Sequence, residues 1–284
     1  MYWGKNYFYY KNFAGLMLLL VLPFMTFAIG VYMLIYSPYP FLFGSVYGFI
    51  ALVVGMSRSL SGIAMRRYQK FHIRQALAIT TMANKWIFVP PCVRVFHAHL
   101  LILKEHYREA EDILSKLGDK DLVYADTAKM KANMALVEWK LNDNLEGALE
   151  NIKKSVRKGC DESISYVLTR LYLEKEMFRE TRTYIEDLIQ TMGNQVGLRQ
   201  NLVMAYFQTT QNHDAKLHFR VLYYDLNGAN KDTLYFMGKL KMEEKKVEDG
   251  IEFMKKALTF EKTSIDIVDD DRISKELVSY EESI

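Results

Sequence analysis

Apolar and polar residues follow a helical period through most of the chain after residue 91, and one amphipathic pattern returns about every 34 residues. In its first form, residues 105–117, an apolar residue precedes a small one by three positions, and large apolar residues follow on the same helical face. The small residues that mark its five occurrences are Ala110, Ala148, Thr181, Ala215 and Gly250. Because a steady period of this length is typical of stacked helical hairpins, the pattern predicts an all-α solenoid.

A second amphipathic stretch precedes each occurrence, so every repeat is expected to contain two helices. The predicted first helices are residues 94–104, 127–141, 163–174, 198–209 and 232–242. The positions at which the two helices of a repeat should cross hold Ala98, Leu136, Thr169, Val203 and Gly238. Three of these five side chains are small, which lets the two backbones approach closely. The alternative is a non-repetitive helical domain whose apolar spacing imitates a period.

From Cys92 to Lys262 the chain resembles the tetratricopeptide repeat family, whose unit is a pair of antiparallel helices of about 34 residues. It departs from the family pattern because most of the consensus Trp and Leu-Gly positions are absent and no proline follows Pro91. The resemblance implies an α-solenoid of about five hairpins over residues 92–262. It also implies that the first helix of each repeat lines a concave groove.

The first 91 residues differ from the rest in charge, because they contain eight basic and no acidic residues. Residues 13–36 carry no charge, and as a helix of about 36 Å they could cross an apolar layer of about 30 Å. A turn with two prolines leads to a second uncharged run, residues 41–57. We therefore predict a transmembrane hairpin over residues 1–57, with spans at about 13–36 and 41–57. The alternatives are a cleaved signal peptide and a re-entrant or interfacial second helix.

The distribution of positive charge predicts the orientation of this hairpin. Lys5 and Lys11 precede the first apolar run, five basic residues follow the second, and the turn between the runs has none. By the positive-inside rule, both termini and the repeats face the cytoplasm, and the hairpin lies in the cell (plasma) membrane. The five residues expected at the membrane surface are Arg58, Arg66, Arg67, Lys70 and Arg74.

Residues 58–91 are predicted to form a basic helix followed by a linker. Two interpretations of the helix remain open: it lies against anionic lipid beside the membrane, or it is the first helix of the solenoid. Pro90 and Pro91 cannot continue a helix, so we place a domain boundary there.

The resemblance places the candidate binding residues on the first helix of each repeat. The candidates are His99, Asn133, Lys140, Tyr166, Arg170, Gln200, Met204, Phe207, Tyr235 and Lys239. Such a groove is apolar with amides and cations, and it suits a protein or peptide partner that presents large side chains and a carboxylate. The alternative is that several of these residues pack against neighbouring helices.

The last segment, residues 263–284, is acidic, with seven Asp and Glu residues against two basic ones. We predict either a solvated tail or a capping helix. A further hypothesis is that the acidic segment lies in the cationic groove in place of the real ligand.

Residue patterns for chemistry are nearly absent. Cys92 and Cys160 stand far apart, and His97 and His99 lie on different helical faces, so neither pair has metal-ligand spacing. No phosphate loop or catalytic motif occurs. We expect no cofactor and no enzyme activity. We also expect no nucleic-acid partner, because the basic residues of the first 91 flank the most apolar part of the chain.

These observations favour a membrane-anchored cytoplasmic scaffold or adaptor that recruits a partner to the inner membrane surface. Its expected partners are a protein or peptide, the lipid bilayer and another membrane protein. The last is expected because the second span has a small-residue face made of Gly44, Gly48, Ala51 and Gly55. One alternative is a peptide-responsive regulatory sensor. Another follows from the layout, which resembles an accessory subunit of a bacterial envelope or exopolysaccharide (Pel-like) export machine.

Overall fold

The computed structural model of the chain describes residues 56–85, 89–118, 122, 124–156 and 161–281. The expected transmembrane spans, 13–36 and nearly all of 41–57, lie outside these ranges. Within them, no helix combines the length and the apolar character needed to cross a bilayer.

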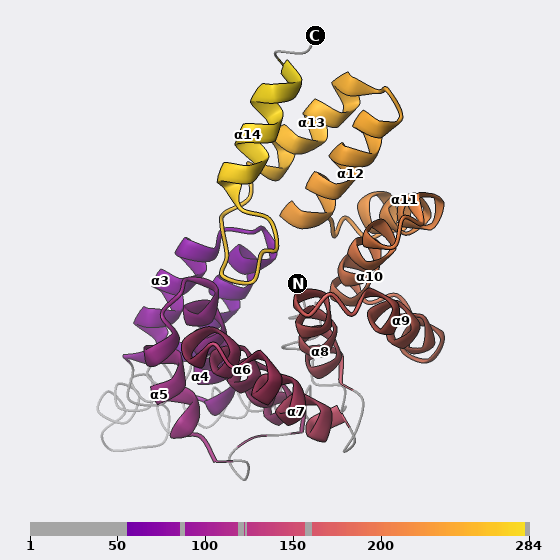
Figure 1. Ribbon diagram of the computed structural model, residues 1–284. Helices are drawn as coiled ribbons and strands as arrows, with labels where there is room; N and C mark the ends of the chain where they lie inside the picture. The colour runs from indigo at the N-terminus through magenta and orange to yellow at the C-terminus, as the bar shows by residue number, and fades with distance from the viewer. Residues whose placement is uncertain (1–55, 86–88, 119–121, 123, 157–160, 282–284) are drawn as a thin grey trace, which may run out of the picture.

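The described chain is all-α, as predicted, and its helices pair into antiparallel hairpins that stack side by side (Figure 1). The first hairpin consists of helical residues 56–69 and α3 (Ile73–Asn84). The next two hairpins are α4 (Pro91–Leu103) with α5 (Tyr107–Ser115), and α6 (Tyr124–Asn142) with α7 (Leu145–Val156). Then follow α8 (Glu162–Glu174) with α9 (Phe178–Met192), and α10 (Val196–Gln208) with α11 (Asn212–Arg220), which continues as the π-helical turn η2 (Val221–Asp225). The last hairpin is α12 (Lys231–Glu243) with α13 (Val247–Ala257). The five predicted repeats are thereby confirmed as an α-solenoid.

The crossing positions explain why the period is visible in the sequence. The five crossing residues of the first helices and the five small residues of the second helices are buried, and at the two glycines among them no side chain would fit. In the last hairpin, a Cβ on Gly238 would lie only 3.0 Å from the carbonyl oxygen of Gly250. The two glycines therefore allow α12 and α13 to meet backbone to backbone.

The turns within the hairpins share one conformation. Each contains a non-glycine residue with a positive φ, namely Phe71, Glu105, Asp143, Glu176, Thr210 and Lys245. The amide that follows such a residue donates to a carbonyl five residues back in most of them, as Met177 does to Tyr172 at 2.8 Å. Because the turn between residues 56–69 and α3 has the same form, these two helices make a sixth hairpin that the sequence pattern missed.

This first hairpin packs on α4 and belongs to the common core. Ala64, Met65 and Tyr68 are buried in it, and the Tyr68 ring meets Phe96 edge-on at 5.7 Å. The basic helix was interpreted either as a membrane-surface helix or as the first helix of the solenoid. For residues 56–69 the structure supports the first helix of the solenoid. The division into residues 58–91 and 92–262 stays a prediction, since the core continues across it.

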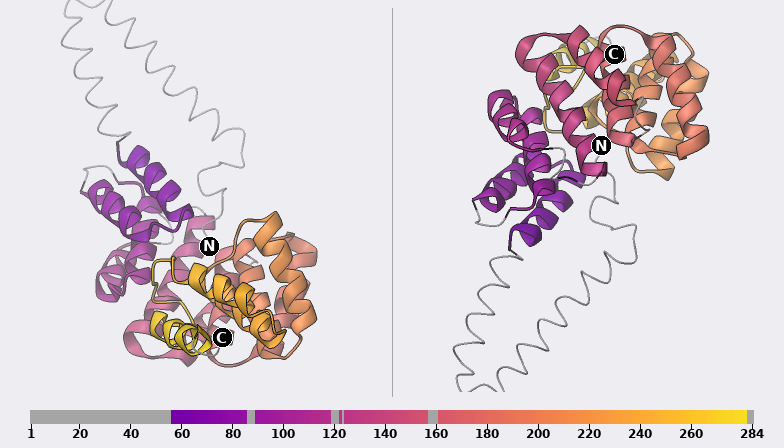
Figure 2. Two further views of the ribbon diagram at one scale, coloured as in Figure 1. Left: turned by 90° about the horizontal axis from the view of Figure 1, so that it is seen from above. Right: turned by 90° about the horizontal axis from the view of Figure 1, so that it is seen from below.

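The end of the chain returns across the interior of the solenoid. After α13, residues 258–269 run back towards the first repeats, and the amide of Ser264 donates to the carbonyl of Leu103 at 3.0 Å. The chain then forms α14 (Asp270–Glu281), which packs against α13. Figures 1 and 2 show this yellow segment between α3 and α12, so the last hairpin is tied to the first ones.

Candidate functional site

The ten candidate binding residues line the interior of the solenoid, and most of them are covered. His99, Asn133, Tyr166, Arg170, Gln200, Met204 and Tyr235 are buried, whereas Lys140, Phe207 and Lys239 are partly exposed. Two kinds of surroundings cover the buried ones: neighbouring repeats in the first half of the solenoid, and the returning C-terminal segment in the second half.

In the first half, neutral side chains satisfy one another. His99 bonds the hydroxyl of Tyr68 through Nε2 at 3.2 Å and the side-chain oxygen of Asn133 through Nδ1 at 3.0 Å. The amide nitrogen of Asn133 donates to the carbonyl of Val95 at 3.1 Å. Burial lowers the pKa of His99 to about 3, so its imidazole is neutral at physiological pH. His97, which bonds Thr80 at 2.9 Å, has its pKa lowered by burial to about 4.

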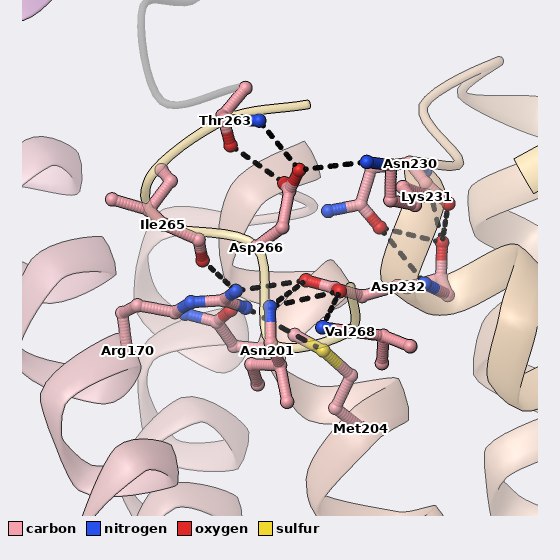
Figure 3. A network of polar contacts seen from close by, with 12 residues as sticks. Arg170, Asn201, Met204, Asn230, Lys231, Asp232, Thr263, Ile265, Asp266 and Val268 are labelled. Carbon is pink, nitrogen blue, oxygen red and sulfur yellow. Dashed lines mark hydrogen bonds and ion pairs between the residues drawn. The ribbon is translucent and has the colours of Figure 1, made fainter. Parts of the chain in front are cut away.

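In the second half, charged side chains meet in the interior. Arg170, on α8, donates to the carboxylate of Asp232, on α12, at 2.8 Å, and both side chains are almost completely buried. The same guanidinium donates to the carbonyl oxygen of Ile265 and contacts the sulfur of Met204 at 3.7 Å. One oxygen of Asp232 accepts the backbone amides of Ile267 and Val268, each at 3.0 Å. Figure 3 shows how these groups converge on the segment from Thr263 to Val268.

Lys231 adds a second cation to this site. Its ammonium lies 3.3 Å from the carboxylate of Asp266 and 2.6 Å from that of Asp270. The Asp266 carboxylate also accepts the backbone amide of Thr263 at 2.8 Å and its hydroxyl at 2.7 Å, which closes a tight turn. Burial, followed by the charge of Asp232, raises the pKa of Asp266.

We call residues 261–268 the strap. Its beginning is held by α4: Lys104 donates to the carbonyl of Lys262 at 2.9 Å and pairs with Glu261 at 3.2 Å. The hydroxyl of Ser264 donates to the carbonyl of Ile102 at 2.6 Å. The strap therefore gives the carbonyl of Leu103 a partner at the C-terminal end of α4 and adds a second donor to that of Ile102, which also accepts the amide of Glu105.

Helix α14 covers the remaining candidates of the second half. Tyr235 donates to Glu276 at 2.7 Å, and Lys239 lies 3.4 Å from the other oxygen of that carboxylate. Lys140 stands apart from this helix, with its ammonium 3.5 Å from the centre of the Trp139 ring. Carboxylates of the chain itself thus lie against two of the cations that we expected to face a ligand.

The sequence pattern missed Lys104, Lys231 and Asp232 as site residues. Asp232 lies 62 residues from Arg170, which is not a multiple of the repeat, so periodicity does not pair the two. The available signal is the first turn of α12, where charged residues follow the capping residue Asn230 directly and enter the interior with the helix.

The five basic residues expected at a membrane surface, Arg58, Arg66, Arg67, Lys70 and Arg74, are exposed on the first hairpin. Near them Ile63 is 48% exposed. Of the two cysteines, Cys160 lies outside the described residues, and Cys92 is half-buried, with the pKa of its thiol raised by burial. In the described part of the chain, no three His, Cys, Asp or Glu side chains are grouped to hold a metal ion.

Comparison with known proteins gives a similarity among solved structures. No protein-family model matches the chain, and no curated protein matches it in sequence. A crystal structure of a tetratricopeptide repeat protein from Parabacteroides merdae is similar to it, with a TM-score of 0.52. The sequence identity is 14%, and the match covers 90% of this chain and 97% of that one. This chain has a tetratricopeptide repeat fold.

In the described structure, the interior of the solenoid already holds a non-helical segment of the chain, the strap, through its backbone groups.

Proposed function

We propose that the protein is a membrane-anchored scaffold whose tetratricopeptide repeats hold a partner protein or peptide at the cytoplasmic surface of the cell membrane. One observation carries the proposal: the solenoid interior presents donors and acceptors that hold the backbone of a non-helical segment. An interior of this kind is suited to peptide recognition, because main-chain bonds provide affinity for a peptide backbone while side-chain contacts provide specificity.

The anchor is inferred from the sequence together with the first hairpin. The apolar runs 13–36 and 41–57 end where the described helix 56–69 begins. Arg58, Arg66 and Arg67 are exposed on that helix, so their charges are available to anionic lipid headgroups. The basic surface and the apolar runs together favour a solenoid that lies next to the membrane.

Protease protection tests the location and the orientation. A protease added to intact cells should leave the repeats uncut, and it should cut them after the cells are opened. Digestion of the repeats in intact cells would place them outside and end the proposal. A variant in which Arg58, Arg66 and Arg67 are all changed to Gln should stay in the membrane fraction of cells. When its apolar runs are embedded in nanodiscs, this variant should bind anionic vesicles less tightly than the wild-type chain does.

Capture from gently solubilised membranes tests the scaffold role. A protein partner in stoichiometric amount supports the scaffold. A short bound peptide instead favours the sensor, which uses the same interior for a signalling ligand. Absence of any protein or peptide partner after cross-linking in cells would contradict both roles.

A further inference from the structure

The strap is held mainly through its backbone. The carbonyls of Lys262 and Ile265 accept from Lys104 and Arg170, and the amide of Ser264 donates to the carbonyl of Leu103. Two more strap amides, those of Ile267 and Val268, donate to Asp232. Most of these bonds would form with any segment whose backbone follows the same turned path, because they do not involve strap side chains.

The strap side chains add a specific pattern to these backbone contacts. Ser264 bonds a carbonyl of α4, Asp266 faces Lys231, and Val268 is buried at 1% exposure. Ile265 is also buried, at 9%. The pattern read along the strap is therefore hydroxyl, aliphatic, carboxylate, any residue, aliphatic.

The charge of the site requires an acidic occupant. Among the described residues, the charged side chains of the solenoid that contact the strap are three cations, Lys104, Arg170 and Lys231, and one anion, Asp232. Asp232 neutralises Arg170, so two positive charges remain, and that of Lys231 is nearly inaccessible to water and costly unless an anion approaches. Glu261 and Asp266 of the strap, together with Asp270 at the start of α14, supply this negative charge.

The strap does not fill the site completely. A partly open cavity of about 60 Å³ remains beside it, lined among others by Tyr68, Tyr166, Gln200 and Ile265. The Nε of Arg170 is buried there without a hydrogen-bond partner in the described structure. A segment with a larger apolar side chain at the position of Ile265 would fill more of this space, since packing gains increase with contact area.

We propose that the surface formed by the end of α4, Arg170, Lys231 and Asp232 is the partner site, that it takes an acidic–aliphatic peptide with the turn of the strap, and that the strap occupies it in cis until such a peptide displaces it. This inference rests on the proposed scaffold function and specifies its ligand. The strap is covalently attached and competes at an effective concentration on the order of millimolar. A partner segment must therefore have the same kinds of side chain as the strap and bind the site more tightly than the strap does.

The test uses the full-length chain in mild detergent and a fluorescent peptide with the strap sequence, residues 261–270. Asp266→Lys in the chain places a cation against Lys231 and should release the strap. The amides of Ile267 and Val268 should then exchange with deuterium faster, and the peptide should bind at least tenfold more tightly than it binds the wild-type chain. Asp269→Lys is the matched control, because Asp269 is exposed and pairs only with exposed Lys262, and it should leave the peptide affinity unchanged.

A second variant protects the test against misfolding of the first. Ile265→Gly removes the aliphatic anchor of the strap without adding charge, and it should also raise the peptide affinity. Unchanged affinity in both variants would overturn the proposal. The same positions can be changed in the fluorescent peptide. A peptide with Asp266→Lys should not bind the chain variants whose strap is released, whereas a peptide with Ile265→Phe should bind them several-fold more tightly than the unchanged peptide does.

Competition separates this inference from the function on which it rests. A partner captured from membranes that the strap peptide displaces supports both. A partner that remains bound in excess peptide supports the scaffold but places its ligand elsewhere, which overturns the inference alone. Tight peptide binding to the opened variants with no partner in cells would leave the site established and contradict the scaffold.

Discussion

In the first half of the solenoid, from residue 56 to α7, the buried polar side chains that the structure describes are neutral, whereas in the second half, from α8 to α14, they include paired charges. Tyr68, His99 and Asn133 bond one another across the first half. Arg170 and Asp232 pair across the second, but their remaining bonds go to the strap.

This difference shows which half can stand without an occupant. His99 and Asn133 are 34 residues apart, so two successive repeats supply both partners of a bond and close the first half from within. In the second half the occupant comes from 95 residues beyond Arg170. We conclude that the first half is closed mainly from within, and that the second half holds the segment together with the end of α4.

The largest expected effect comes from breaking the charged half. Asp232→Ala leaves Arg170 buried without its anion and removes the acceptor of two strap amides, so it should lower the free energy of unfolding by about 3–5 kcal/mol. Urea unfolding followed by circular dichroism measures this. Asp112→Ala, which removes an exposed pair with Lys116, is the control and should cost about 1 kcal/mol or less. Equal costs for the two variants would mean that the buried charges are not what distinguishes the second half.

An intermediate effect is expected from acid on the neutral half. The pKa of His99 is about 3 in the folded chain against 6.5 as its ordinary value, so the unfolded chain binds the proton first as the pH falls. The stability that His99 provides is complete above pH 6.5 and is lost towards pH 3, with a loss of about 2 kcal/mol between pH 7 and pH 5.

The measurement compares wild type with His99→Gln by urea unfolding at several pH values. The difference between the two should shrink or reverse as the pH falls, because glutamine does not titrate. If the free energies of unfolding of the two proteins changed with pH in parallel, the imidazole of His99 would not be held neutral. The strap should respond in the opposite direction: the pKa of Asp266 is raised, so its protonation in the folded chain favours folding as the pH falls.

The smallest effect is expected where the two halves are alike, in the turns. Glu105 in the first half and Glu176 in the second have φ values of 67° and 58°, a region that costs a residue with a side chain about 1–2 kcal/mol. Changing either to Gly should raise the free energy of unfolding by about 0.5–1 kcal/mol. Glu111→Gly, in the middle of α5, should lower it by about 1 kcal/mol. If one turn variant raised the free energy of unfolding and the other lowered it, the hairpins would not be equivalent.

Much of the repeat architecture could be predicted because its determinants are local. Ala110 and Gly250 mark helix crossings, and each helix lies within a few residues of the predicted span. The hairpin of residues 56–84 was left open because its basic and apolar residues fit a membrane-surface helix equally well. Its burial of Tyr68 against Phe96 and His99 is a tertiary contact that periodicity does not reveal.

The candidate site was predicted only in outline. The positions on the first helices do line the interior, yet Arg170 and Tyr235 face the chain's own strap and α14 instead of an open groove. Lys231 and Asp232 escaped notice because a Lys-Asp pair in a first helical turn is equally typical of a solvated helix end.

By itself the sequence determined the all-α class, the 34-residue unit and the crossing residues. Each of these depends on neighbours within one or two helical turns or on composition, so the order of residues contains it. Only the tertiary structure decided what fills the interior. What fills the interior depends on contacts between residues that lie 62 to 162 positions apart in the sequence. These contacts form only when the curved solenoid brings its last segment back to its first repeats.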